Sequence, residues 1–202
     1  MKTDLQTEEK ILIAAEEEFL EQGFTGARLQ KIADSAGLNK ALLHYYFRSK
    51  DRLFEVVFEK IASQIISQLL EKITAETTIF EKIRFFFDYH MSAIENNQRL
   101  PLFVINEIAR NPDRIFQFIK KDDVSDLRKT LEGQLNSEIE RGIIRQIAVE
   151  ELILNCISLS VFNFIAKPMY KQVLGISNKE FAQFLIHRKT SLAEFVINSI
   201  KI

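Results

Sequence analysis

The chain has 202 residues, of which 47% are hydrophobic, and its 27 lysines and arginines nearly balance 28 aspartates and glutamates for a net charge of −1. This composition predicts a sizeable core in one or two domains and excludes a general affinity for nucleic acid over the whole surface. Only 6 glycines and 3 prolines interrupt the chain, which favours long helices over a many-turned β architecture.

Three features indicate a cytoplasmic protein. Residues 1–10 are polar and charged, unlike a signal peptide. The longest apolar run, residues 152–166, contains Asn155 and Asn163 and is shorter than the ~20 residues that a membrane span needs. The single cysteine, Cys156, excludes an intramolecular disulfide framework and is typical of a reducing compartment. We therefore expect a cytoplasmic protein that does not contact a membrane.

Apolar residues recur at helical spacing along nearly the whole chain, and no strand candidate is found, so the sequence predicts an all-α fold. The first helix is expected from about Thr7, as the N-cap, to Gln22, with Gly23 as the C-terminal stop. The remaining helices are expected at about residues 28–35, 40–47, 49–74, 79–95, 101–111, 113–120, 122–141, 149–166 and 179–202.

Two short amphipathic helices flank Gly37, which can accept the positive φ of a tight turn. Asn39 is a good N-cap for the second helix. In that helix Leu43 and Phe47 point to one side, while Lys40 and His44 share another face. This pattern is typical of a helix-turn-helix, although an ordinary αα-hairpin in a helical core shares it.

Positive charge is concentrated around this pair of helices. Between Gly23 and Arg52 there are six cations and two carboxylates. The cations are Arg28, Lys31, Lys40, Arg48, Lys50 and Arg52. Ser49 is a ready N-cap for the next helix, so Lys50 would lie at a helix N-terminus, where free amide groups favour an anion.

The stretch from about residue 11 to residue 53 resembles the TetR/AcrR family of bacterial transcriptional repressors. The residues that carry the resemblance are Ile11, Ala14, Ala15, Phe19, Gly23, Phe24, Ile32, Ala33, Ala36, Gly37, Lys40, Leu43, Tyr46, Phe47, Ser49, Lys50 and Leu53. The resemblance implies an N-terminal three-helix DNA-binding domain over residues 1–48. A larger helical domain for ligand binding and dimerisation would follow over residues 49–202.

In the resembled family, residues at six positions of this segment commonly contact DNA. Those residues are here Lys40, Ala41, His44, Tyr45, Tyr46 and Lys50. Arg28 could hold a further phosphate. The chain departs from the family pattern where Ala41 replaces a usual glycine, Leu42 a small polar residue and His44 a tyrosine, which affects individual contacts and the operator sequence. The four acids of the first helix, Glu16, Glu17, Glu18 and Glu21, would repel phosphate, so we expect their face to point away from DNA.

The resemblance also implies a ligand cavity in the C-terminal domain. The chain has 17 phenylalanines and no tryptophan, and three consecutive phenylalanines on one helix cannot all face one core. We expect the cavity to be lined by Phe86, Tyr89, His90, Phe103, Glu107 and Phe162. Glu107 would be the counter-charge and His90 a hydrogen-bond partner for an apolar, aromatic or cationic ligand. Ordinary core packing of the same side chains is the alternative.

The family dimerises through its last two long helices, here about residues 149–166 and 179–202. We expect the interface to include an apolar stripe on the last helix, formed by Phe181, Leu185, Leu192, Phe195 and Val196.

The sequence has no enzyme motif or cofactor fingerprint around His44, His90 or His187. Asp88 and His90 diverge on a helix and could share a metal only with Glu107 of the next helix, so His90 is favoured as a polar residue of a pocket or core. The predicted function is a one-component repressor, homodimeric on double-stranded DNA, that a small-molecule inducer releases from a palindromic operator. The alternative is a small-molecule-binding or lipid-binding helical protein without sequence-specific DNA binding.

Overall fold

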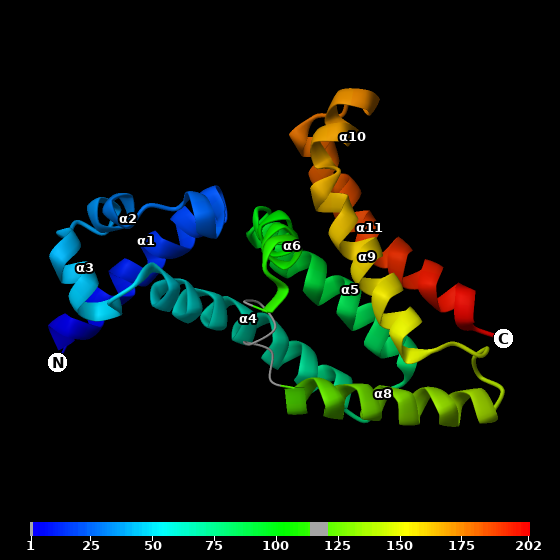
Figure 1. Cartoon of the computed structure of the whole chain (residues 1–202). Helices are drawn as coiled ribbons and strands as arrows, with labels where there is room; N and C mark the ends of the chain where they lie inside the picture. The colour runs from blue at the N-terminus through cyan, green and yellow to red at the C-terminus, as the bar shows by residue number, and fades with distance from the viewer. Residues whose placement is uncertain (1, 114–120) are drawn as a thin grey trace. The chain divides into compact units, whose positions relative to one another are not determined.

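The structure is a computed structural model that describes residues 2–113 and 121–202 (Figure 1). Its helices are α1 (Lys2–Gly26), α2 (Leu29–Ser35), α3 (Lys40–Phe47), α4 (Lys50–Thr74), α5 (Ile79–Asn96), α6 (Leu100–Arg110), α8 (Lys121–Glu140), α9 (Val149–Ile165), α10 (Lys167–Leu174) and α11 (Asn178–Ile200). Within these ranges the only extended pairing is an isolated antiparallel bridge between Ile144 and Lys201. The predicted all-α class is therefore confirmed.

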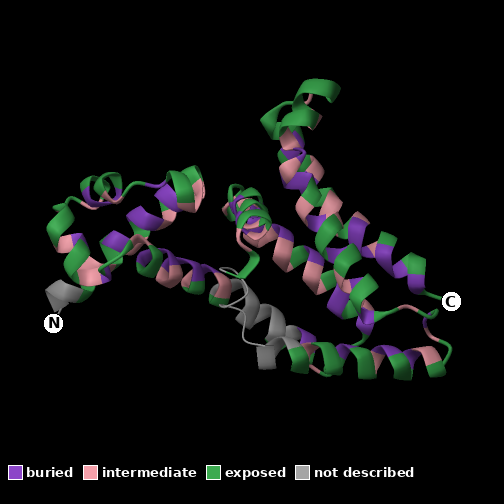
Figure 2. Cartoon of the chain, viewed as in Figure 1, coloured by how far each residue is buried: buried purple, intermediate pink, exposed green. Residues whose placement is uncertain are grey.

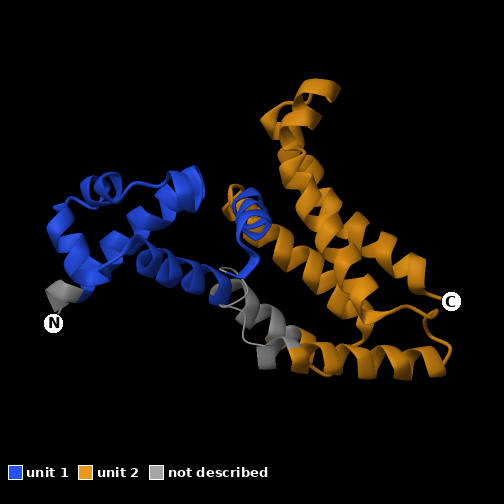
Figure 3. Cartoon of the chain, viewed as in Figure 1, with its two compact units in different colours: residues 1–64, 102–119 blue, residues 65–101, 120–202 orange. Residues whose placement is uncertain are grey.

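The described helices divide into two compact units (Figure 3). Unit 1 consists of residues 1–64 and 102–119, and unit 2 of residues 65–101 and 120–202. The sequence-based prediction divides the chain after residue 48. In the structure, the first part of α4 and most of α6 belong to the same unit as the N-terminal helices. Both α4 and α6 therefore contribute residues to each unit.

Unit 1 packs α1, α2 and α3 around a small apolar core, to which α4 and α6 add aromatic rings. Its buried residues include Ile11, Ala15, Phe19, Ile32, Ala33, Leu43, Phe47, Leu53, Phe54 and Phe103. Two predicted caps are confirmed: the Leu42 amide donates to Asn39 Oδ1 over 2.8 Å, and the Arg52 amide donates to Ser49 Oγ over 3.0 Å. Gly37 adopts φ 70° between α2 and α3, as the turn requires.

Helix α1 differs from its prediction at both ends. It begins at Lys2, before the expected cap at Thr7, and it continues past Gly23 to Gly26. Gly23 does interrupt it, with φ 67° and ψ 174°, so the glycine bends the chain and one more helical turn follows.

Glu18 does not lie on the outer face of α1 as expected. Its side chain is 5% exposed, because Oε1 accepts the Arg28 amide over 3.1 Å and Oε2 lies 2.7 Å from Lys31 Nζ. Arg28 stands at the start of α2, where no local side chain caps the helix. The carboxylate from α1 therefore binds the N-cap amide of α2, which in a capping box is bound by a Glu or Gln at the third helical residue.

Unit 2 is built around α5, which packs against both α9 and α11, and α8 also contacts α9 (Figure 1). Its core is mainly aliphatic, with Ile83, Phe87, Met91, Leu135 and Leu185 among its buried members. Capping boxes start α5 at Thr78 with Glu81 and α11 at Ser177 with Glu180.

Helix α10 was not predicted, because Pro168 was interpreted as the end of the helix before it. The proline instead stands in the first turn of α10, where its missing amide would have no intrahelical partner in any case. The helix has no buried residue and is largely exposed (Figure 2). The short helix expected at 113–120 lies, after its first residue, outside the described residues.

Among the described residues, no single helix is long and apolar enough to cross a membrane. Helices α9 and α10 meet that criterion only when taken together, and they are bent by 57° at the break between them.

Candidate functional site

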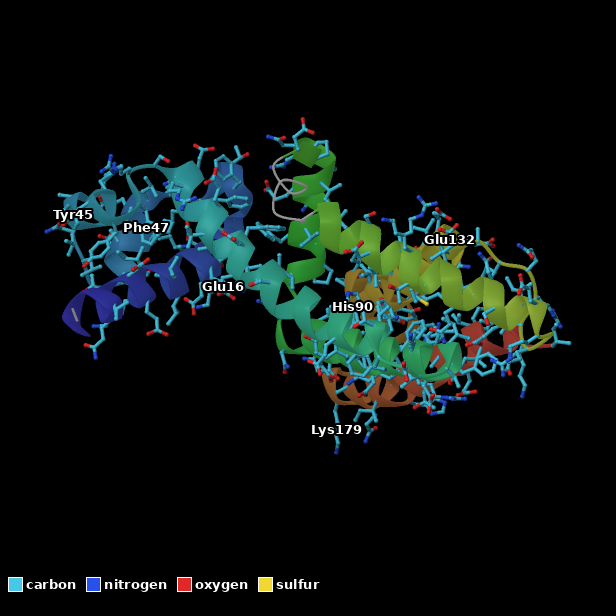
Figure 4. The ribbon with its side chains drawn as sticks, turned by 90° about the horizontal axis from the view of Figure 1, so that it is seen from below. Glu16, Tyr45, Phe47, His90, Glu132 and Lys179 are labelled. Atoms are coloured by element: carbon cyan, nitrogen blue, oxygen red, sulfur yellow. The ribbon has the colours of Figure 1, made fainter. Side chains whose placement is uncertain are left out.

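The outer face of α3 carries polar and aromatic side chains on a buried apolar base. Leu43 and Phe47 are buried against the core of unit 1. Lys40 and His44 are exposed, and Tyr45 is 78% exposed. Tyr45 points away from the unit while Phe47 lies inside it (Figure 4). Helix α3 therefore presents a cation, an imidazole and a phenol on a face that is exposed among the described residues of unit 1.

Side-chain contacts at the end of α3 fix two of these groups. His44 Nδ1 lies 3.2 Å from the carbonyl oxygen of Arg48, so this nitrogen carries the proton and Nε2 remains an acceptor in the neutral ring. The rings of Tyr45 and Tyr46 meet edge to face, with centroids 5.5 Å apart. Arg48 ends the helix with φ 54°, a value uncommon for a residue other than glycine.

Lys50, at the first turn of α4, is held by the end of α1. Its Nζ donates to the carbonyl oxygen of Thr25 over 3.2 Å and lies 4.9 Å from the centroid of the Phe24 ring. The ammonium group is thereby held at one place near the N-terminus of α4.

Lys31 and Arg52 of this region face carboxylates of the chain itself. Lys31 contacts Glu18 and Glu21, and its hydrogen bond to Glu18 raises its pKa. Arg52 pairs with Glu55 over 3.0 Å. Arg28 and Lys40, by contrast, are exposed and appear in no ion pair within the described residues. This surface can therefore bind anionic phosphate oxygens and read the edges of bases.

The residues predicted to line a ligand cavity are divided between the two units. Phe103 and Glu107 belong to unit 1, where Phe103 packs on Phe54 with ring centroids 5.9 Å apart and Glu107 Oε1 accepts the Phe24 amide over 3.0 Å. Phe162 belongs to unit 2 and is 58% exposed on α9. The carboxylate of Glu107 is therefore used inside unit 1, and we withdraw its predicted role as a counter-charge for a ligand.

Three of the predicted ligand residues, Phe86, Tyr89 and His90, lie close together on α5. Tyr89 and His90 stack on different rings. Tyr89 stacks on Phe85 with ring centroids 5.5 Å apart, and burial raises its pKa. His90 stacks on Phe86, and its Nδ1 lies 2.9 Å from Ser160 Oγ. Because the Ser160 hydroxyl donates to the carbonyl oxygen of Ile157, it accepts from His90 Nδ1–H. Burial lowers the pKa of His90 to about 4, so the ring is neutral near pH 7.

Unit 2 contains an apolar cavity of about 160 Å³ between α4, α5, α8 and α9. Its lining residues are Ile73, Ile79, Lys82, Ile83, Phe86, Leu127, Leu131, Leu152, Ile153, Cys156 and Ile157. Of the predicted ligand residues only Phe86 is among them. The aliphatic residues were missed because leucine and isoleucine at helical spacing are also the ordinary signal of core packing.

Cys156 and Lys82 are the lining residues with reactive or polar groups. Burial raises the pKa of the Cys156 thiol to about 12, so it behaves as a small apolar side chain. Burial also lowers the pKa of Lys82, whose Nζ donates to Gln134 Oε1 over 2.6 Å. The amide of Gln134 in turn donates to Glu138 Oε1 over 2.8 Å, which ties the ammonium group into a cluster at the cavity wall.

The predicted dimer stripe on α11 lies mostly inside one chain. Phe181, Leu185, Leu192 and Val196 are each 1–3% exposed in the core of unit 2 and have almost no surface to offer a second chain. Phe195 is the exception, at 63% exposed. Helical spacing identified an apolar face correctly, but it could not show that α5 and α9 of the same chain cover that face.

Helix α9 carries exposed apolar side chains that the sequence analysis did not assign to an interface. Leu154 is 65% exposed and Phe162 is 58% exposed. Leu154, Val161 and Ile165 recur at intervals of seven and four residues and so share one face of the helix. In the part of the chain that the structure describes, no cluster of three or more His, Cys, Asp or Glu side chains could hold a metal ion.

Residues 11–57 match the model of a family described as bacterial regulatory proteins, tetR family. The chain is 31% identical over 141 residues to the HTH-type transcriptional repressor NicS of Pseudomonas putida, covering 68% of this chain and 63% of NicS. It is 24% identical to the fatty acid metabolism regulator protein of Bacillus subtilis, covering 84% of this chain and 89% of that protein. The crystal structure of the Bacillus subtilis regulator FadR in complex with stearoyl-CoA superposes with a TM-score of 0.67 at 21% identity, covering 93% and 96% of the two chains.

Proposed function

Because the chain belongs to the TetR family of bacterial regulatory proteins, we propose that it is a one-component transcriptional repressor that a small apolar ligand releases from its operator. The observation that carries this proposal is the outer face of α3. It is polar, aromatic and cationic, its opposite face is anchored in the core of unit 1, and it lies within the segment that matches the family.

Helix α3 is proposed to enter the major groove of DNA. Lys40, at its N-terminus, can donate to the O6 and N7 acceptors of a guanine. Lys50 and Arg28 are proposed to bind phosphates, which position the reader without reading sequence. Tyr45 and Tyr46 can donate their hydroxyl groups to phosphate, and His44 can accept through Nε2 or bind phosphate when it is protonated.

The experiment that tests this function is binding of the purified protein to the promoter DNA beside its own gene. We expect binding that is tighter than to a shuffled fragment of the same length and that weakens with a linear dependence of log affinity on log salt. The shuffled fragment is the control for electrostatic, sequence-independent association. If no fragment of that promoter is bound at low salt, the repressor proposal fails, and the alternative of a ligand-binding or lipid-binding helical protein is favoured.

A homodimer is proposed as the DNA-binding form. Helix α3 has 8 residues, and at a rise of about 1.5 Å per residue it spans only ~12 Å, so one copy can read few base pairs. Two copies on a palindrome would read half-sites roughly 34–36 Å apart or a multiple of it. The exposed apolar face of α9 with Leu154 and Phe162, together with Phe195 of α11, is the surface that supports such an association.

The ligand is proposed to place an apolar group in the cavity of unit 2. A dry cavity of about 150 Å³ lined by similar side chains is known to bind benzene, so the cavity here suits a ring or a short alkyl group. The name of a similar Bacillus subtilis regulator of fatty acid metabolism and the stearoyl-CoA complex of the Bacillus subtilis regulator FadR support a ligand with a hydrocarbon part.

A further inference from the structure

The helical turn that follows Gly23 has a cap supplied by a distant helix. The Ala27 amide donates to the carbonyl oxygen of Gly23 over 3.2 Å, which closes a turn that begins at Phe24. A residue in the place of Gly23 would normally offer a side-chain oxygen to the amides of this turn, and glycine has none. Glu107 fills this place from α6, 83 residues further along the chain, with Oε1 3.0 Å from the Phe24 amide.

The carboxylate of Glu107 is committed to this position. Glu107 is 2% exposed, and a Cβ added to Gly23 would lie 3.5 Å from Glu107 Oε1, so the two residues are in direct contact. A buried charge is costly unless it is hydrogen-bonded, and the N-terminus of a helical turn is a favourable place for an anion.

The capped turn holds the cation of Lys50. Lys50 Nζ donates to Thr25, the second residue of the turn, and lies over the ring of Phe24, the first residue. The Phe24 ring is itself fixed edge to face against Phe54, with centroids 5.1 Å apart. The Thr25 carbonyl and the Phe24 ring, which help to position the ammonium, therefore both belong to the turn whose first amide Glu107 binds.

Phe103 holds the same face of α6 against the unit. It lies four residues before Glu107, one helical turn away, and its ring centroid is 5.9 Å from that of Phe54 and 6.2 Å from that of Phe58. Two side chains on one face of α6 thus bind two different elements of unit 1, namely α4 and the end of α1.

We propose that Glu107 is a positioning residue for DNA binding, which acts by fixing the Phe24–Ala27 turn and through it the ammonium group of Lys50. Glu107 does not touch DNA. The turn also leads directly into Arg28 and α2. The same cap therefore also determines the backbone position of Arg28, the second proposed phosphate-binding residue. This inference rests on the proposed DNA-binding function.

The test is a double-mutant cycle on the full-length protein, with operator affinity and its salt dependence measured by fluorescence anisotropy of a labelled promoter fragment. Glu107→Ala is expected to reduce the slope of log affinity against log salt by about one unit per bound reader, as Lys50→Ala does, because both lose the same phosphate contact. The double variant is expected to bind no more weakly than the weaker of the two single variants.

Two further variants separate positioning from a general loss of folding. Glu107→Gln keeps an oxygen that can accept the Phe24 amide, so it should restore the salt slope of the parent. Asn106→Ala, at the exposed neighbouring residue of α6, is the matched control and should leave both affinity and slope unchanged. Circular dichroism and thermal unfolding confirm that each variant is folded.

The outcomes distinguish this inference from the proposed function. A parent protein that binds no promoter DNA overturns both. If the parent binds but the affinity losses from Glu107→Ala and Lys50→Ala add in full, the positioning role alone is overturned. An unchanged salt slope in Glu107→Ala has the same consequence.

Discussion

Several buried polar side chains of this chain bind groups on elements far from their own in sequence. Glu18 accepts the amide at the start of α2, Glu107 accepts the amide of Phe24, and His90 donates to Ser160. Glu18 and Glu107 each bind a backbone amide at the start of a helical segment. The hydrogen bond of His90 fixes the neutral form of its ring. These partners lie 10, 83 and 70 residues away, so no local sequence pattern indicates them.

His90 should make the stability of the protein depend on pH. Burial lowers its pKa from 6.5 to about 4, so between these values the unfolded chain binds more protons than the folded chain. The contribution to stability is therefore present above the unfolded pKa and is lost as the pH falls toward the folded value. Between about pH 7 and pH 4.5 we expect the parent to lose about 2–3 kcal/mol more unfolding free energy than His90→Gln.

Urea unfolding at both pH values measures this difference. The carboxylates of the chain titrate in parent and variant alike, so they cancel in the comparison. Glutamine can still donate to Ser160, which keeps the hydrogen bond while removing the titration. Identical pH dependence in the two proteins would show that the imidazole is not held neutral by burial.

At the scale of elements, the helices and their caps could be predicted wherever the signal is local. Asn39, Gly37 and Ser49 delimit α3 and the start of α4 as expected, because capping and positive φ depend on residues adjacent in sequence. The partners of each apolar face could not be predicted. The stripe on α11 proved to be the core of unit 2, and α6 proved to pack in unit 1, because helical periodicity identifies a buried face and not what covers it.

Two glycines in helical regions should respond to alanine in opposite ways. Gly23 has φ 67° and ψ 174°, a conformation nearly confined to glycine, so Gly23→Ala should destabilise the protein by about 1–3 kcal/mol. Gly133 lies within α8, and an added Cβ would meet nothing within 4 Å. Gly133→Ala should therefore stabilise the protein by about 0.5–1 kcal/mol. Urea unfolding of the two variants beside the parent measures both signs, and a neutral Gly23→Ala would show that the turn after Gly23 relaxes freely.

On the scale of the whole molecule, the exposed face of α9 should determine assembly. Phe162 is 58% exposed within one chain, so Phe162→Glu adds a charge without opening a core and should convert a dimer into a monomer. Ile13→Glu is the matched control, because Ile13 is 50% exposed on α1 and lies in the other unit. Sedimentation at micromolar concentration measures the change. A parent that sediments as a monomer, or a Phe162→Glu variant that remains dimeric, would contradict the proposed interface.

Helix α4 is the route that we propose between the ligand cavity and the proposed DNA-binding residues. It begins at Lys50 and includes Ile73, which lines the cavity of unit 2, so one continuous helix carries both a proposed phosphate contact and a cavity wall. A ligand changes operator affinity only if it binds the DNA-free state more tightly than the DNA-bound state. A tenfold loss of affinity requires about 1.4 kcal/mol of coupling, which the burial of about two methylene groups can supply.

The last prediction follows from the volume of the cavity. Cys156 lines the cavity with a small, unreactive side chain, and Cys156→Phe would fill a large part of its volume of about 160 Å³. A panel of benzene derivatives and short alkyl compounds, screened for release of promoter DNA, supplies an inducer. We expect Cys156→Phe to require at least about tenfold more of that inducer for half-release, because the side chain occupies the space of its apolar group. Cys156→Ala leaves the space open at the same position and should respond like the parent. If the inducer releases DNA from all three proteins at the same concentration, it binds elsewhere and the cavity is only a packing defect of the core.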